Sequence, residues 1–243
     1  MARTLLVRGM LVGLVAGVLA LLFGKLVGEG PINSAIAFEY AHQAPGMDDP
    51  AIVSRTIQST IGLGVAVLIY GSALGGIFAL VFGFAYGRLG RLGARATALV
   101  VGMLGFVAVY LAPFLKYPAN PPAIGRSDTI EHRSALYFSM IVISVAAAVG
   151  AVVLGRRLLA RFSNWDAVLI SAAAFTAVVV IAWLVMPTVD EVPADFPATV
   201  LWHFRVASVG TQLVLWGTCG LLFGALTDRS LRRGAVARPV PVG

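Results

Sequence analysis

The sequence predicts an all-α protein, a polytopic transmembrane helical bundle with about six spans. Of its 243 residues, 59 % are hydrophobic and only 12 % are charged, and the mean hydropathy is +0.91. A soluble domain usually carries about twice this charged fraction, and its surface has to stay partly polar. Lipid is therefore the expected solvent for most of the chain.

Six apolar runs are the expected membrane spans, because a helix needs roughly 20 apolar residues to cross the hydrocarbon layer. They cover residues 4–27, 57–86, 96–115, 134–154, 167–186 and 206–226. The second run is longer than a perpendicular span, so we expect it to tilt or to begin outside the bilayer. Asp166 and Pro187 flank the fifth run as typical start and stop signals. Residues 1–228 are then one transmembrane domain, and 229–243 are a basic cytoplasmic tail.

The loops between the runs fall into two sets that differ in charge. One set holds clustered arginines, and the other holds nine of the eleven acidic residues and lies next to all three histidines. Cytoplasmic loops are rich in lysine and arginine, so the arginine loops and both termini are expected inside. The arginines are Arg3, Arg8, Arg88, Arg91, Arg95, Arg156, Arg157, Arg161, Arg229, Arg232, Arg233 and Arg238, and the acidic residues are Glu29, Glu39, Asp48, Asp49, Asp128, Glu131, Asp190, Glu191 and Asp195.

Other interpretations of this pattern are weaker. Arg3, Arg8 and the run after them are similar to a signal peptide, but the run is long and no clear small-x-small cleavage site follows it. The net charge of +7 comes from short clusters between the runs, without interleaved aromatic residues. It indicates membrane topology and no nucleic-acid partner. The single cysteine, Cys219, has no partner for an intramolecular disulfide.

The six runs can also be read as three helical hairpins of about 75 residues each. In each, the second run begins with an arginine at its outer end: Arg55, Arg133 or Arg205. Proline-rich outer loops at 112–122 and 186–197 strengthen the likeness between the second and third hairpins. The alternative is convergence, since any six-span protein contains hairpins and interfacial arginines often snorkel.

Glycines four residues apart predict close helix packing. They occur as Gly9, Gly13 and Gly17, then Gly71 and Gly75, Gly83 and Gly87, and finally Gly220 and Gly224. Small residues at this spacing let helix backbones approach each other in lipid. The pattern fits a tight bundle or a contact in a homo-oligomer.

The sequence carries no pattern that indicates an enzyme. It lacks the GxxxxGK[ST] and HExxH motifs and a serine–histidine–acid arrangement. No carboxylate, lysine, arginine or histidine lies in the middle of a run, where ion-coupled carriers normally keep an ionisable group. We expect no catalytic activity and no permanently bound cofactor.

The candidate metal ligands lie in the outer loops. Imidazole and carboxylate groups suit a borderline divalent ion such as cobalt, nickel or zinc. Glu39 and His42 would share one face of a helix, Glu131 adjoins His132, and His203 ends the third loop. Their spacing matches no known ligand motif, so solvated loop histidines are the alternative.

Polar side chains near the outer ends of the runs form a candidate pore mouth. They are Arg55, Gln58, Lys116, Arg133, Arg205 and Gln212. The glutamines either line an entrance or hydrogen-bond between helices, and Lys116 either pairs with an outer carboxylate or snorkels. The arginines are either neutralised by outer carboxylates or suited to an anionic or corrinoid substrate.

Several segments resemble CbtA, a family of predicted cobalt transporter subunits. They are PFLKYPANPPAIG at 113–125, RSALYFSMIVIS at 133–144 and HFRVASVGTQLVLWGTCGLLFG at 203–224, together with RGMLVGLVAGVLA and FEYAHQA near the N-terminus. The resemblance implies a bacterial inner-membrane protein linked to cobalt uptake for cobalamin synthesis. It also implies a small single-span companion subunit with a histidine-rich end, but no ligand set.

We therefore expect a multi-pass permease subunit of the bacterial cytoplasmic membrane that admits a divalent transition-metal ion, cobalt by resemblance, as its substrate. The alternative is a non-transporting structural or accessory subunit of a larger membrane complex. The glycine spacing and the absence of ionisable groups inside the runs favour that alternative.

Overall fold

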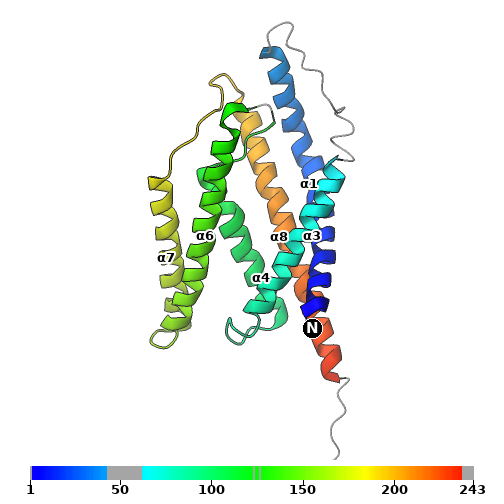
Figure 1. Cartoon of the computed structure of the whole chain (residues 1–243), viewed down its shortest axis with the longest axis vertical. Helices are drawn as coiled ribbons and strands as arrows, with labels where there is room; N and C mark the ends of the chain where they lie inside the picture. Colours follow the sequence, from blue (N-terminus) through cyan, green and yellow to red (C-terminus); the bar gives the residue numbers. More distant parts are fainter. Residues whose placement is uncertain (1, 43–61, 123, 126, 237–243) are drawn as a thin grey trace, which may run out of the picture. The chain divides into compact units, whose positions relative to one another are not determined.

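The computed structural model of the chain describes residues 2–42, 62–122, 124–125 and 127–236 (Figure 1). These residues form helices and loops without a strand, which confirms the all-α prediction. Six helical segments are long and apolar enough to cross a membrane: Ala2–His42, Gly64–Ala85, Ala94–Lys116, Ile130–Leu158, Asn164–Val185 and Ala198–Arg233. Each overlaps one of the six predicted runs.

The first and last helices extend well beyond their predicted spans. Helix α1 (Ala2–His42) has 41 residues and α8 (Ala198–Val236) has 39. At 1.5 Å per residue each is about 60 Å long, about twice the thickness of the hydrocarbon layer. Polar residues such as Glu29 end an apolar run without ending the helix. The predicted boundary at residue 228 falls inside α8, and the division into a domain and a tail stays a prediction.

The chain forms two compact units, each built from separate segments. Unit 1 comprises Met1–Lys25, Gly46–Met103 and Gly210–Gly243, and unit 2 comprises Leu26–Pro45 and Leu104–Val209. Unit 1 holds α3 (Leu63–Ala85) and most of α4 (Ala94–Gly105). Unit 2 holds α5 (Ala112–Lys116), the 3-10 turn η3 (Ser127–Thr129), α6 (Ile130–Leu158) and α7 (Asn164–Val185). Both α1 and α8 contribute residues to both units.

In unit 1, α1 and α3 pack with their backbones in contact (Figure 1). Gly9 and Gly13 face Gly71 and Gly75, and a Cβ atom added to Gly71 would lie only 2.6 Å from the carbonyl oxygen of Gly13. No side chain larger than hydrogen fits there. The predicted close packing is confirmed for these glycines.

Helix α8 packs against α4 and α3 in the same unit. A Cβ atom on Gly224 would lie 3.0 Å from the Cβ atom of Ala98 in α4. Phe223 is fully buried, and its ring meets those of Phe78 and Phe82 edge to face at 5.4 and 5.0 Å. Helix α8 thus contacts α4 through Gly224 and α3 through the ring of Phe223.

Gly83 and Gly87 make no close helix contact within the described part of the chain, and their alternative role in a homo-oligomer contact stays a prediction. A Cβ atom on Gly83 would have no atom of the described residues within 4 Å outside its own helix turn. Gly87 lies beyond the end of α3, in a turn where its φ is 76°. Its spacing from Gly83 therefore reflects the turn, where glycine avoids the strain of a positive φ.

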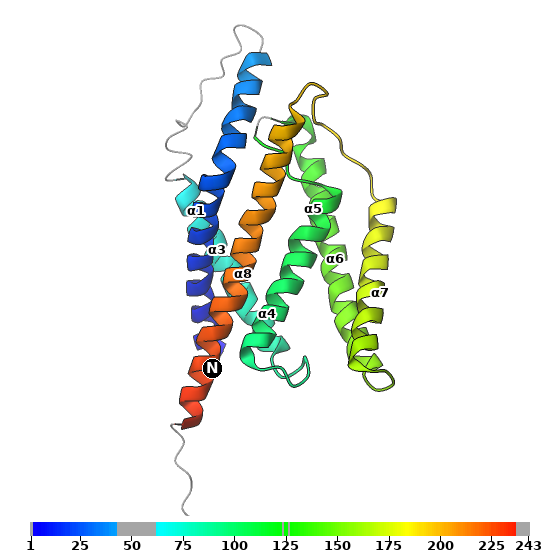
Figure 2. The same ribbon diagram turned by 180° about the vertical axis from the view of Figure 1, so that it is seen from behind.

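In unit 2, α6 and α7 lie side by side (Figures 1 and 2). Helix α7 begins after Ser163, whose Oγ accepts the backbone N–H of Asp166 at 3.2 Å and donates to the Asp166 carboxylate at 2.8 Å. It ends at Val185, directly before Met186 and Pro187. The stop signal at Pro187 is confirmed, since prolines mark helix ends. The start lies three residues before the predicted run, because Ser163 is the cap and Asp166 lies in the first turn of the helix.

The third span, Ala94–Lys116, changes from an α-helix to a π-helical turn near its middle. Between α4 and α5 the chain forms a π-helical turn, η2 (Phe106–Leu111). Ser144 of α6 donates to the carbonyl oxygen of Ala108 at 2.5 Å, and Trp183 Nε1 of α7 donates to that of Ala112 at 3.2 Å. Side chains of two neighbouring helices therefore bind backbone groups at this wide turn. Such turns often lie at functional sites.

Candidate functional site

Unit 2 contains a polar pocket of about 390 Å³, which we name the loop pocket. It is lined by residues 117–120, Ile124 and residues 189–192 from the loops, and by residues of η2, α5, α6 and α8. Its polar lining includes two arginines, two carboxylates, three tyrosines and an asparagine, so its formal charges balance. These residues are Tyr110, Tyr117, Asn120, Arg133, Tyr137, Asp190, Glu191 and Arg205.

An ion pair joins the two sides of the pocket. Arg133 Nη1 of α6 lies 3.2 Å from Glu191 Oε2, and the two side chains are 28 % and 10 % exposed. The Thr129 hydroxyl donates to Glu191 Oε1 at 2.5 Å. Gly125 has a φ of 118°, and a Cβ atom there would lie 2.5 Å from Arg133 Nη1. Of the two alternatives for the predicted mouth arginines, Arg133 shows the pairing with a carboxylate of the acidic loops.

Arg205 connects α8 to the loop with the sequence PANPP. Its Nε donates to the carbonyl oxygen of Ala119 at 3.3 Å, and its Nη2 donates to Asn120 Oδ1 at 3.0 Å. Both acceptors belong to the short stretch between two prolines. Because the donors of a guanidinium have a fixed geometry, Arg205 orients this loop along the pocket wall.

Two tyrosines give the pocket different hydroxyl groups. Tyr117 Oη donates to the carbonyl oxygen of Pro187 at 2.8 Å, and loss of water contact raises the pKa of this phenol above its ordinary value. The hydroxyl of Tyr110, on the π-helical turn, is buried and has no hydrogen-bond partner in the described part of the chain. Buried polar groups are nearly always paired, so the Tyr110 hydroxyl is an exception in the wall of the pocket.

Lys116 does not line the loop pocket. Its Nζ donates to the carbonyl oxygen of Trp183 at 2.7 Å, in the last turn of α7. The last carbonyls of a helix carry partial negative charge, which favours a nearby cation. The ammonium group binds a backbone carbonyl here, whereas the two expected alternatives were pairing with an outer carboxylate and snorkelling.

The five candidate metal ligands do not gather into one site. His42 Nε2 lies 3.0 Å from Asp195 Oδ2, and its Nδ1 lies 2.8 Å from the carbonyl oxygen of Phe38. The helix does continue through Glu39 to His42, but Asp195 is the carboxylate that His42 meets. Glu131, His132 and His203 are exposed on α6 and α8. No group of three or more His, Cys, Asp or Glu able to hold a metal occurs among the described residues.

Of the four predicted mouth residues that the structure describes, Arg133 and Arg205 line the loop pocket, whereas Lys116 and Gln212 do not. Arg55 and Gln58 lie outside the described residues, and Gln212 is half-buried on the part of α8 that belongs to unit 1.

Six of the eight polar pocket residues named above are not among the predicted site residues, and only Arg133 and Arg205 are. In the sequence, Glu191 is one acidic residue of its loop, and Asn120 is part of the KYPANPP segment. Tyr110 carried no signal, because it is one aromatic residue in an apolar run.

The helices and the pocket define a multi-pass helical membrane protein with a charge-balanced polar site built by two loops. The family model described as "Probable cobalt transporter subunit (CbtA)" matches residues 2–228. The chain therefore belongs to this family, and the resemblance of its segments is confirmed. The word subunit implies a complex with other chains. No curated protein and no solved structure matches the chain.

Proposed function

We propose that the protein is a permease subunit of the bacterial cytoplasmic membrane that admits a divalent transition-metal ion, cobalt, for cobalamin synthesis. Membership of a cobalt transporter subunit family over residues 2–228 carries the proposal. The six apolar helices supply the membrane-spanning part. In this proposal cobalt is the substrate and not a resident cofactor, and the chain catalyses no reaction.

Both termini are proposed to lie in the cytoplasm. Arg8 Nη1 near the start of α1 donates to Thr227 Oγ1 near the end of α8 at 3.2 Å, and Arg95 Nε at the start of α4 lies 3.0 Å from Asp228 Oδ2. These three helix ends share one end of unit 1, as an even number of spans requires. Their arginines favour the cytoplasmic side, and the loops at 117–129 and 186–197 then face outward.

The loop pocket is the proposed entrance for the ion. Asp190 and Asn120 offer oxygen atoms to a hydrated cation. The pairing of Arg133 with Glu191 offsets one negative charge. An ion can pass through a conducting site only if it binds weakly enough to be released. A charge-balanced entrance therefore suits the passage of the ion better than its tight binding.

The exposed loop residues Glu39, His42, Glu131, His132 and His203 are the proposed first contacts for the ion. At His42 a metal ion would have to displace Asp195, because both ring nitrogens already have partners. Further proposed partners are a small single-span companion with a histidine-rich end and a second copy of this chain.

Cobalt uptake by proteoliposomes tests this proposal, with the protein reconstituted alone and together with the companion. Glu191→Gln should lower the initial uptake rate at least threefold, because it leaves Arg133 uncompensated in the entrance. Glu29→Gln is the matched control: it removes the same charge from an exposed position on α1 outside the pocket and should keep the parent rate.

A triple variant, His42→Ala with His132→Ala and His203→Ala, tests the first contacts in the same vesicles. Uptake at the parent rate would remove these histidines from the mechanism. No uptake by the parent protein, alone or with the companion, would refute the permease role. It would favour the second candidate, a non-transporting accessory subunit, which the lack of a clustered metal site among the described residues already favours.

A further inference from the structure

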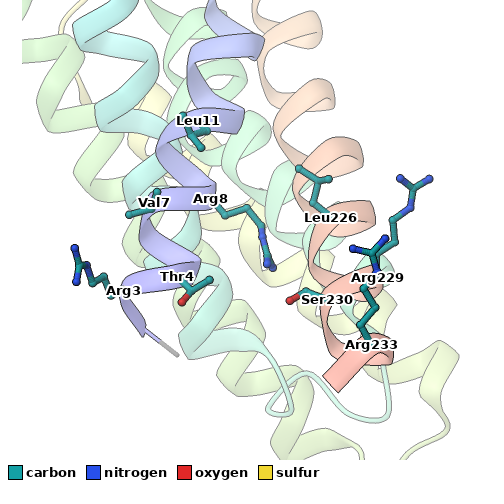
Figure 3. Close-up of a pocket in the computed structure, with 9 residues that line it drawn as sticks. All are labelled: Arg3, Thr4, Val7, Arg8, Leu11, Leu226, Arg229, Ser230 and Arg233. Carbon is teal, nitrogen blue, oxygen red and sulfur yellow. The ribbon is translucent and has the colours of Figure 1, made fainter. Parts of the chain in front are cut away.

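A second cavity, in unit 1, has no part in the proposed entrance. It is a groove of about 860 Å³ between the start of α1 and the end of α8 (Figure 3). We name it the arginine groove, because Arg3, Arg8, Arg229 and Arg233 line it. Figure 3 shows Arg8 reaching from α1 toward α8, where Ser230 faces it, while Arg229 and Arg233 project from the last turns of α8.

The described residues around the arginine groove do not neutralise its positive charge. None of the residues that line it is acidic. The nearest carboxylate along α8, Asp228, already pairs with Arg95 at 3.0 Å and with Arg232 at 3.1 Å, neither of which lines the groove. Arg8 bonds to the uncharged hydroxyl of Thr227. Within the described part of the chain, none of Arg3, Arg229 and Arg233 has a carboxylate partner.

Apolar side chains continue the groove from the arginines toward the middle of the spans. Val7 and Leu11 of α1 are 47 % and 59 % exposed, and Leu226 of α8 is 36 % exposed. All three line the groove together with the arginines. A cationic rim beside an exposed apolar strip matches a molecule with a negatively charged head and a hydrocarbon chain.

We propose that the arginine groove binds an anionic phospholipid of the bilayer. The guanidinium groups contact the phosphate, for which their paired N–H donors are well suited, and an acyl chain lies along Val7, Leu11 and Leu226. Basic pockets between transmembrane helices are known to hold anionic headgroups. A soluble phosphate compound would use the arginines but leave the apolar strip uncovered, so the lipid is the better match.

Native mass spectrometry of the purified full-length protein tests the proposal. The protein is titrated with phosphatidylglycerol, with phosphatidylcholine of the same acyl chains, and with phosphatidylglycerol in the presence of glycerol 3-phosphate. Phosphatidylglycerol should bind at least tenfold more tightly than phosphatidylcholine, and glycerol 3-phosphate at an equal concentration should not displace it.

Arg229→Gln with Arg233→Gln should weaken phosphatidylglycerol binding roughly 30-fold, because each arginine near a membrane surface contributes about fivefold. The matched control is Arg91→Gln with Arg161→Gln, which removes two exposed arginines from turns outside the groove and should bind like the parent. Ser230→Glu adds a negative charge inside the groove, and it should weaken binding even if the double arginine variant does not fold.

Equal affinity for the two lipids, or equal losses in the groove and control variants, would overturn the proposal. Displacement by glycerol 3-phosphate would instead identify a site for soluble phosphate compounds and would equally refute a lipid site. Cobalt uptake is not part of this measurement, so the result is independent of the proposed transport function.

Discussion

Replacing Gly75 by alanine should weaken the contact between α1 and α3. The added Cβ atom would lie 2.8 Å from Gly13 Cα and 2.9 Å from Gly13 N. Non-bonded carbon atoms prefer about 3.5 to 4.0 Å, so the two helices would have to separate by roughly 1 Å. The methyl group would also meet the carbonyl oxygen of Gly9. All three of these atoms belong to a backbone, so no side chain can rotate away.

The size of the effect follows from a comparison within α3. Gly83→Ala adds the same methyl group where no atom lies within 4 Å. Both variants gain the helix propensity of alanine over glycine, about 0.5 to 1 kcal/mol, and this gain cancels in the difference. What remains is the cost of overpacking, about 1 to 3 kcal/mol. Gly75→Ala should be less stable than Gly83→Ala by that amount.

Equilibrium unfolding in mixed micelles with a rising fraction of sodium dodecyl sulfate, followed by far-UV circular dichroism, measures this difference. The Gly75→Ala protein should unfold at a lower detergent fraction than Gly83→Ala, and Gly83→Ala at the parent fraction or above it. Equal midpoints would show that α1 and α3 do not meet through these glycines, and the packing assigned to unit 1 would then be wrong.

Two further predictions use the same unfolding assay. In a double-mutant cycle, Arg133→Gln and Glu191→Gln should show a coupling free energy of about 1 to 2 kcal/mol. The reason is that the ion pair is less exposed than a surface ion pair yet not fully desolvated. A coupling free energy below about 0.3 kcal/mol would contradict the pairing. Ser144→Ala should lower the free energy of unfolding by about 0.6 to 1.7 kcal/mol, because it removes the buried bond to Ala108. The control Thr176→Ala loses only an exposed bond to its own helix and should change this free energy by less than about 0.5 kcal/mol. Equal effects of the two variants would rule out a bond between α6 and the π-helical turn.

The spans were predictable because lipid imposes a simple rule on composition: about 20 apolar residues in sequence. Helix ends outside lipid follow other rules. Helix α1 continues past Lys25, Glu29 and Pro31 to His42, since Ala35 there packs with Ile124 and Phe196 in a small apolar cluster. Contacts between residues so far apart in sequence leave no periodic signal in one chain. A prediction from hydropathy therefore places the end of the first span at residue 27, where the apolar run ends.

The candidate site was predictable in part for a related reason. Arg133 and Arg205 stood out because charge is rare next to an apolar run, and both line the loop pocket. Their partners could not be assigned, because Glu191 and Asn120 reach them only through the conformations of two loops. Those conformations depend on local details such as the φ of 118° at Gly125, which the sequence alone does not reveal.

The loop between α7 and α8 is attached at three places along its length. Pro187 accepts from Tyr117, Glu191 pairs with Arg133, and Asp195 meets His42. A reporter peptide inserted between residues 187 and 196 would therefore separate bonds that fix the pocket, and insertions are tolerated best where backbone and side chains are free of such contacts. The exposed turn at Arg91 offers a safer position for mapping which side of the membrane each loop occupies.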